Sequence, residues 1–286
     1  MESVNFDRAA SFYDATRALP VGAMRELTSL LAAELALRSP CLEIGVGTGR
    51  FALALRDRGI AMAGADISGA MLRRLVANAG GRPPLPLVQA DATRLPVAAG
   101  TFGSVLAVHV LHLIPDWRIA VDEAARVLRP GGTLLASFPT DNRAAPDTGL
   151  SDTGLSDTGL SGPSLTGRAA EAGAPWSAAL GEAARRHGMV RRAIGARDPQ
   201  AVAAYLGSRA TARELEPVTY RTVTTLGETL SSFEQQLFSW TWPYSAGQAA
   251  AVAAAVRDWA ERTGLPLSAA HESLAASRWW AFDLTL

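Results

Sequence analysis

Three glycines at alternate positions, Gly45, Gly47 and Gly49, follow the short apolar run 41–44 and precede a helix-like run that begins at Arg50. Glycines at this spacing let the backbone turn sharply and let a ligand approach without a Cβ in its way, while the new helix offers its free N–H groups. A dinucleotide fingerprint requires G-x-G-x-x-G, and here Arg50 stands where the third glycine would be. A pyrophosphate site is therefore disfavoured.

Carboxylates follow two further apolar runs. Asp66 comes after the run 60–65, and Asp91 comes after a run that ends at Ala90. A carboxylate at the C-terminal end of the second strand can accept both hydroxyl hydrogens of a ribose. Enzymes that bind NAD use the same contact, so Asp66 indicates a nucleoside ligand without distinguishing between cofactors.

Two histidines, His109 and His112, lie at the end of a fourth apolar run, SVLAVHV. Imidazole has a pKa suited to accepting a proton from a phenol or a hydroxyl group. Two interpretations stay open at this position. Either histidine could act as a general base, or the side chain only packs against a bound cofactor.

The apolar runs alternate with helix-like runs, and this alternation predicts parallel strands joined by helices. The carboxyl ends of parallel strands meet at one edge of a sheet, so the glycine turn, Asp66, Asp91 and His109 are expected to converge on one ligand. The turn RPGG precedes a fifth expected strand, TLLASF, and the runs LEPVTYRTV (215–223) and SRWWAFDLTL (277–286) are expected to form later strands.

Composition changes along the chain suggest four segments. Residues 1–40 carry two apolar stripes at helical spacing and are expected to form a helical cover, followed by the cofactor-binding core at 41–140. Residues 141–175 contain three copies of DTGLS, which cannot bury a core, and are expected to be a flexible low-complexity insert. Residues 176–286 are expected to add helices and the last two strands to the same domain.

Four strings together resemble the motifs of the class I S-adenosylmethionine (SAM) dependent methyltransferases, in particular small-molecule enzymes with a methyltransferase-11-like domain. They are EIGVGTG (43–49), DATRLP (91–96), HVLHL (109–113) and VLRPGG (127–132). Phe102-Gly103 departs from the family's usual Phe-Asp, which is a turn feature. The resemblance implies an α/β fold with a Rossmann-like, doubly wound, seven-stranded sheet, mostly parallel with an antiparallel last strand.

The resemblance also implies a cofactor site. Asp91 with Ala92 would bind the adenine amino group, and an N-terminal helix carrying Tyr13 and Arg17 would fold over the cofactor. Glu43 would either hold the glycine turn or contact the amino group of the cofactor. The expected cofactor ligands are Tyr13, Arg17, Glu43, Gly45, Gly47, Thr48, Gly49, Asp66, Ile67, Ser68, Met71, Asp91, Ala92 and His109; His109 and His112 are the candidate catalytic residues, and no metal is expected.

Composition limits the partners and the chemistry. The formal net charge is zero, so no basic excess indicates a nucleic acid partner, and all 27 basic residues are Arg, which removes lysine-based covalent catalysis. The single cysteine, Cys41, lies in an apolar run and is expected to be an inert buried thiol. No apolar run approaches membrane-spanning length. A cytoplasmic protein, monomeric or homodimeric, without membrane contact, is expected.

The predicted activity is transfer of a methyl group from SAM to a small, apolar or aromatic molecule by in-line displacement, with S-adenosylhomocysteine (SAH) as product. One alternative is a non-catalytic SAM-binding or scaffold protein, because a fold does not establish turnover. A second alternative, an NAD(P)-dependent oxidoreductase, is disfavoured by Arg50 and by the DATRLP and RPGG strings.

Overall fold

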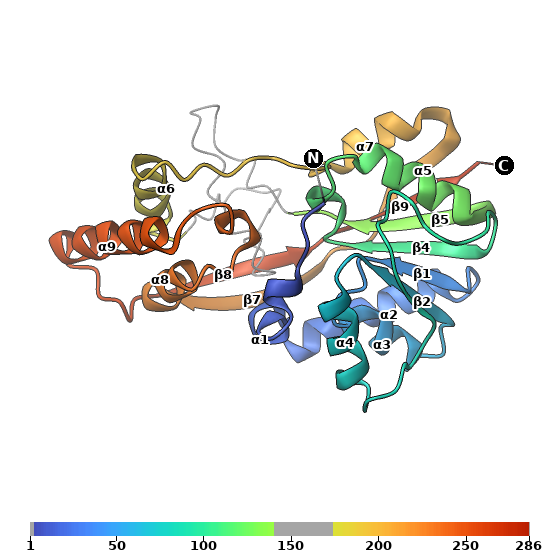
Figure 1. Ribbon diagram of the computed structural model, residues 1–286, viewed down its shortest axis with the longest axis horizontal. Helices are drawn as coiled ribbons and strands as arrows, with labels where there is room; N and C mark the ends of the chain where they lie inside the picture. Colours follow the sequence, from blue (N-terminus) through green and yellow to red (C-terminus); the bar gives the residue numbers. More distant parts are fainter. Residues whose placement is uncertain (1–2, 140–173, 286) are drawn as a thin grey trace. The chain divides into compact units, whose positions relative to one another are not determined.

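The computed structural model describes residues 3–139 and 174–285, which divide into two compact units (Figure 1). The first unit comprises Met1–Pro139, Ala193–Val218 and Ser277–Leu286, and the second comprises Thr140–Arg192 and Thr219–Ala276. Segment 176–286 therefore contributes to both units. The DTGLS repeats lie outside the described residues.

A seven-stranded sheet forms the centre of the first unit, with strand order β3-β2-β1-β4-β5-β9-β6. The strand β9 pairs antiparallel with both of its neighbours, β5 and β6, and the other strand pairs in this sheet are parallel. The predicted fold class, a mostly parallel doubly wound sheet with an antiparallel last strand, is therefore confirmed. The strands are β1 (Cys41–Ile44), β2 (Met62–Asp66), β3 (Leu87–Gln89), β4 (Phe102–Val108), β5 (Leu128–Ser137), β6 (Ala210–Glu214) and β9 (Trp279–Leu284).

Helices cover both faces of this sheet, which explains why its central strands are almost continuously apolar. On one face, α5 and α7 pack on the strands in a core that includes Leu42, Val105 and Leu134. On the other face, Phe51 of α3 contacts Trp279 of β9, with ring centroids 5.6 Å apart. The helical elements are η1 (Asp7–Ala9), α1 (Tyr13–Arg17), α2 (Val21–Leu35), α3 (Arg50–Arg56), α4 (Gly69–Asn78), η2 (Leu111–Leu113), α5 (Trp117–Val127), α7 (Pro199–Leu206) and η4 (Gly207–Arg209).

The strand register brings the loops of the predicted site together at the carboxyl ends of the parallel strands. Ile44 at the end of β1 is level with Ala65 in β2 and with Ala107 in β4. Asp66 at the end of β2 is level with Gln89 at the end of β3. The loops that follow β1, β2, β3 and β4 therefore start side by side.

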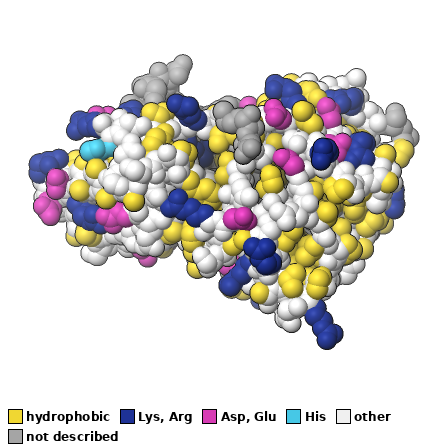
Figure 2. Space-filling model, in the orientation of Figure 1, with side chains coloured by type: hydrophobic (Ala, Val, Ile, Leu, Met, Phe, Trp, Pro, Cys, Tyr) yellow, Lys and Arg dark blue, Asp and Glu magenta, His cyan; other side chains and the backbone are white. Residues whose placement is uncertain are grey.

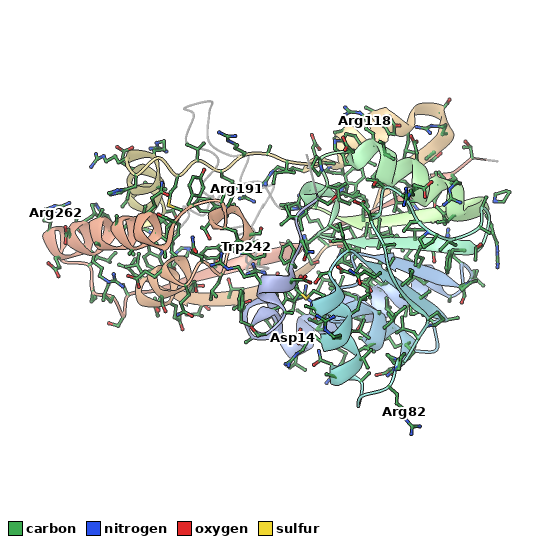
Figure 3. The ribbon with its side chains drawn as sticks, viewed as in Figure 1. Asp14, Arg82, Arg118, Arg191, Trp242 and Arg262 are labelled. Atoms are coloured by element: carbon green, nitrogen blue, oxygen red, sulfur yellow. The ribbon has the colours of Figure 1, made fainter. Side chains whose placement is uncertain are left out.

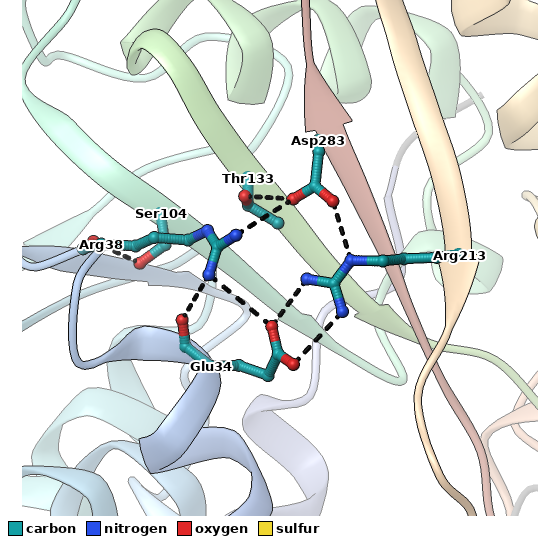
Figure 4. Close-up of polar contacts among 6 residues, drawn as sticks. All are labelled: Glu34, Arg38, Ser104, Thr133, Arg213 and Asp283. Atoms are coloured by element: carbon teal, nitrogen blue, oxygen red, sulfur yellow. Dashed lines mark hydrogen bonds and ion pairs between the residues drawn. The ribbon is translucent and has the colours of Figure 1, made fainter.

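A network of charged side chains lies toward the other end of the parallel strands, away from their carboxyl ends (Figure 4). Asp283 of β9 accepts hydrogen bonds from Thr133 Oγ1 at 2.6 Å and from Arg213 Nε at 2.8 Å. The other nitrogens of Arg213 donate to Glu34 of α2 at 3.2 and 2.6 Å. Arg38 adds a contact to Asp283 at 3.7 Å. The network ties α2 to β5, β6 and β9, away from the loops of the predicted site.

The second unit has its own core and its own two-stranded sheet, β7 (Val218–Thr225) with β8 (Ala270–Ser277). Capping boxes begin α8 and α9, formed by Thr225 with Glu228 and by Ser245 with Gln248. Trp176, Phe233 and Phe238 are buried in that core, and the partly buried Trp240 and Tyr244 pack against it. Its helical elements are α6 (Ser177–Arg186), α8 (Leu226–Glu234), η5 (Ser239–Thr241) and α9 (Ala246–Thr263).

The late strands of the structure differ in part from the expectation. The run 215–223 is a strand over most of its length, but as β7 it pairs with β8 outside the main sheet. The sixth strand of the main sheet is instead β6, which joins β9 in an antiparallel pair, with Glu214 level with Trp280. The strand β8, of sequence AHESLAAS, has no alternation that would have predicted it.

Candidate cofactor-binding site

A pocket lies in the first unit at the carboxyl ends of the parallel strands. Nine of the residues predicted from the sequence to bind a cofactor line it, and these come from the N-terminal helix and from the loops after β1, β2, β3 and β4. They are Tyr13, Gly45, Gly47, Asp66, Ile67, Met71, Asp91, Ala92 and His109.

The glycine turn has the geometry for which glycine is required. Gly45, Gly47 and Gly49 all have positive φ angles, of 66°, 55° and 84°. A Cβ on Gly45 would also lie 2.6 Å from a methyl carbon of Val110 in the neighbouring loop. Because no side chain at Gly49 caps α3, the first N–H groups of that helix need other acceptors.

Glu43 lies beneath the turn and supplies one of those acceptors. Its carboxylate accepts the backbone N–H of Ala52 in the first turn of α3 and lies close to the guanidinium of Arg50. The side chain is 2% exposed, and burial raises the pKa of Glu43 well above its ordinary value. Its Oε2 atom has no hydrogen-bond partner among the described residues. Glu43 does not line the pocket, so this geometry favours the role of holding the turn.

Asp66 joins the glycine turn to the next loop. Its Oδ2 accepts the backbone N–H of Gly47 at 2.8 Å, and its Oδ1 accepts the backbone N–H of Ser68 at 2.8 Å. Burial raises the pKa of Asp66, and these two N–H groups oppose that shift. Each carboxylate oxygen has a second lone pair, so both can still accept a hydroxyl hydrogen from a ligand.

Asp91 has one fixed oxygen and one available oxygen. Its Oδ1 accepts the backbone N–H and the hydroxyl of Thr93, both at 2.8 Å. These contacts orient the carboxylate at the pocket wall beside Ala92. The second oxygen, Oδ2, is able to accept an amino hydrogen from a bound base.

The two histidines have different environments. His109 lines the pocket and has a left-handed backbone with φ of 46°. Its N–H donates to Ser137 Oγ at 3.0 Å, which fixes the point where the chain leaves β4. His112 is 7% exposed and does not line the pocket. The geometry therefore places only His109 where it could face a bound ligand.

The N-terminal segment forms another wall of the pocket through Tyr13 and Phe6. Two carboxylates attach this segment to the loops. Asp7 Oδ1 accepts hydrogen bonds from the Ser68 hydroxyl at 2.5 Å and from the backbone N–H of Ala70 at 3.1 Å, both at the start of α4. Asp14 lies in α1, beside α4 (Figure 3). Its carboxylate accepts hydrogen bonds from the Thr48 hydroxyl at 2.5 Å and from Asn78 Nδ2 at 2.9 Å.

The other predicted ligands lie behind the pocket. The Arg17 carbonyl accepts a hydrogen bond from Arg50, while Gly49 packs near Leu75. Thr48 and Ser68 are buried and bonded to Asp14 and Asp7. In contrast, Ser3, Val4, Phe6, Leu113 and Ile114 line the pocket although the sequence analysis did not single them out. Four of them were recognisable in the sequence only as apolar residues, which does not separate pocket from core, and Ser3 carries no signal of its own.

The charges of the pocket suit a cationic nucleoside better than a dinucleotide. Among the described residues that line it, the formally charged side chains are Asp66 and Asp91, and both are acidic. Carboxylates attract a sulfonium cation, whereas they repel the two phosphates of NAD. The residues present therefore fit a cofactor of the SAM type.

Comparisons with known proteins find a methyltransferase domain in this chain. Residues 42–136 match the family model of the methyltransferase domain. The demethylmenaquinone methyltransferase of Corynebacterium urealyticum is 36% identical over 108 residues, which are 37% of this chain and 45% of that protein. The malonyl-[acyl-carrier protein] O-methyltransferase of Geobacter sulfurreducens is 34% identical over 129 residues, 44% of this chain and 48% of that protein.

A solved structure shows the same fold over most of the chain. The YcgJ protein of Bacillus subtilis superposes with a TM-score of 0.54 and 16% identity, over 92% of this chain and 100% of that one. The chain spans about half the length of the first curated relatives that it matches. Residues 42–136 therefore resemble the methyltransferase domain that these relatives contain.

Proposed function

We propose that this protein transfers the methyl group of SAM to a small, apolar or aromatic molecule and releases SAH. The observation that carries the proposal is the convergence of Asp66, Asp91 and the glycine turn on one acidic pocket. The relatives are named for acceptors as different as demethylmenaquinone and malonyl-[acyl-carrier protein], so similarity in the shared domain does not select the acceptor.

In this proposal the protein binds and aligns the reactants. SAM supplies a methyl group on a positively charged sulfur, which is already a good leaving group. Asp66 holds the ribose, Asp91 holds the adenine, and the backbone of the glycine turn lies against the methionine part. Alignment of donor and acceptor can lower a barrier by roughly 7 to 11 kcal/mol in well-oriented systems.

His109 is the candidate base if the acceptor is a phenol or a hydroxyl group. It lines the pocket, and its backbone is fixed by Ser137 at the end of β4. His112, proposed from the sequence as an equal candidate, is disfavoured because its side chain is buried away from the pocket. The lining of the pocket also contains Phe6, Val110 and Leu113, which suit an apolar acceptor better than a charged one.

We propose that the protein acts in the cytoplasm as a monomer or a homodimer. No nucleic acid partner is proposed. Basic and acidic side chains are interspersed on the face shown in Figure 2, which suits a protein that does not bind a polyanion. In the part of the chain that the structure describes, no helix has the length and apolar character needed to span a membrane. Within that part no cluster of candidate metal ligands occurs either.

Calorimetric titration with SAH, and separately with NAD, tests the proposal. We expect saturable SAH binding at micromolar concentration, about 8 kcal/mol, and no NAD binding. Binding of NAD alone would support the oxidoreductase alternative. SAH release from SAM in the presence of a panel of phenols and hydroxylated aromatics then tests turnover, and binding without turnover across the panel would favour the non-catalytic alternative.

A further inference from the structure

The segment between β4 and α5, residues 109–114, is one wall of the pocket and is here called the β4–α5 wall. His109, Val110, Leu113 and Ile114 of this segment line the pocket. The wall begins at His109 in a left-handed conformation, which a residue other than glycine rarely adopts. Such a conformation persists only where the surrounding structure holds it.

Segments far away in the sequence hold this wall. Val4 N donates to Leu113 O at 3.2 Å, on the side of the N-terminal segment. Residues 193–197, here called the strap, approach from the rest of the first unit. Gly195 N donates to His112 O at 3.0 Å, and Ala196 N donates to Leu111 O at 3.0 Å.

The strap approaches the wall too closely for any side chain at Gly195. A Cβ there would lie 2.1 Å from the carbonyl oxygen of Leu111 and 2.5 Å from that of Ile114. Both neighbouring atoms belong to backbone, so no side-chain rotation relieves the clash. Glycine is therefore needed here for close approach, and the added atom would push strap and wall apart.

The strap is anchored on its far side. Ala196 is 4% exposed and belongs to the core shared with α5 and α7. Asp198 begins α7 by accepting the N–H of Gln200 at 3.0 Å. Tyr205 of α7 donates to Asp122 of α5 at 2.5 Å. Because the strap is fixed in this way, a Cβ added at Gly195 would displace the β4–α5 wall more than the strap.

We infer that Gly195 is a positioning residue for the cofactor pocket. It lets the strap set the position of the β4–α5 wall, and the wall in turn shapes the space in which SAM binds. Gly195 does not itself line the pocket, so it acts through the backbone of residues 111–114. The inference rests on the proposed function, because cofactor binding is the property through which it is observed.

The first test compares Gly195→Ala with Gly22→Ala. Gly22 lies in α2, and no atom lies within 4 Å of the position that a Cβ would take there, so it receives the same methyl group without a clash. SAH affinity is measured by calorimetry at 25 °C, well below the unfolding temperature of each variant. We expect the Kd for SAH to rise by about ten-fold or more in Gly195→Ala and to stay unchanged in Gly22→Ala. A loss of stability alone would not change the Kd of the folded protein.

Hydrogen exchange of the wild-type protein gives a second measurement that does not depend on folding of a variant. SAH at saturation is expected to slow exchange of the Gly195 and Ala196 amides, because a filled pocket stabilises the wall that accepts their hydrogen bonds. The Leu215 amide, which donates to Trp279 at the edge of the sheet, is the internal control and should not change.

The outcomes separate the two proposals. If wild-type protein does not bind SAH, the proposed function fails and this inference fails with it. If wild-type protein binds SAH but Gly195→Ala binds equally well, or if SAH leaves exchange at Gly195 and Ala196 unchanged, the positioning role is refuted while the proposed function stands.

Discussion

Replacement of Asp66 by Asn is the most informative single change, because it preserves shape and removes only charge and acceptor capacity. Both carboxylate oxygens of Asp66 accept a backbone N–H, from Gly47 and from Ser68, each at 2.8 Å. Whichever way an Asn amide is turned, its NH₂ group therefore faces one of these N–H donors. One backbone donor loses its partner, and one ribose hydroxyl loses its acceptor.

The magnitudes predict a larger effect on binding than on folding. A hydrogen bond to a charged acceptor contributes about 1.5–3 kcal/mol, so loss of one ribose contact should weaken SAH binding by roughly 10- to 100-fold. An unsatisfied backbone N–H costs about 1–3 kcal/mol of folding free energy. That cost is partly offset because a neutral amide is easier to bury than the carboxylate, whose pKa burial already raises.

The assay pairs SAH calorimetry with thermal unfolding, and Asp283→Asn is the matched control. Asp283 undergoes the same chemical change, but it lies in the network away from the carboxyl ends of the parallel strands, bonded to Thr133 and Arg213. We expect Asp283→Asn to lower the unfolding temperature and to leave the Kd for SAH unchanged. Asp66→Ala, which removes both acceptors, should weaken binding further than Asp66→Asn.

Two results would refute this reasoning. A folded Asp66→Asn protein that binds SAH with the wild-type Kd would show that Asp66 does not hold the ribose. An equal loss of SAH affinity in Asp283→Asn would show that affinity follows general stability of the sheet and not a contact at Asp66.

Three further predictions concern pH and stability. The affinity for SAH should fall as pH is lowered through the raised pKa of Asp66, because only the carboxylate accepts both ribose hydroxyls; calorimetry across pH checks this. Asp7→Asn should cost about 1 kcal/mol at neutral pH by weakening the start of α4. The hydrogen bond from Ser68 lowers the pKa of Asp7, so this difference in unfolding free energy should vanish as pH falls through that lowered pKa. Arg213→Ala should cost about 1–2 kcal/mol in denaturant unfolding, through lost contacts with Glu34 and the sheet, without changing SAH affinity.

The strand ends were predictable because Gly45, Asp66 and Asp91 each come at the end of an apolar stretch, which is buried in β1 and β2 and partly buried in β3. Gly45, Asp66 and Asp91 each begin a loop where an apolar stretch stops, and the handedness and order of a parallel sheet then place these loops side by side. The thiol of Cys41 is likewise buried as its apolar neighbours predict, and burial raises its pKa to about 12.

Contacts between segments distant in the sequence were not predictable. Nothing in the local sequence pairs Asp7 with Ser68, or Gly195 with the carbonyl groups of residues 111–114. The strand β8 was not predicted because its Ala- and Ser-rich sequence has no period-two alternation of hydrophobic residues. The pairing of β7 with β8 depends on a partner about fifty residues away, as in the contact between Thr222 and Ser273 at 2.8 Å.

The antiparallel pair of β6 and β9 also affects where the chain can tolerate insertions and deletions. Glu214 stands level with Trp280, and Leu215 N donates to Trp279 O at 2.8 Å, so residues 219–276 leave and rejoin the first unit at adjacent positions. An insertion or deletion within that segment alters neither the strand register nor the pairing that closes the sheet. Changes in the exposed loops of this stretch are therefore expected to leave the strand ends that form the pocket in place.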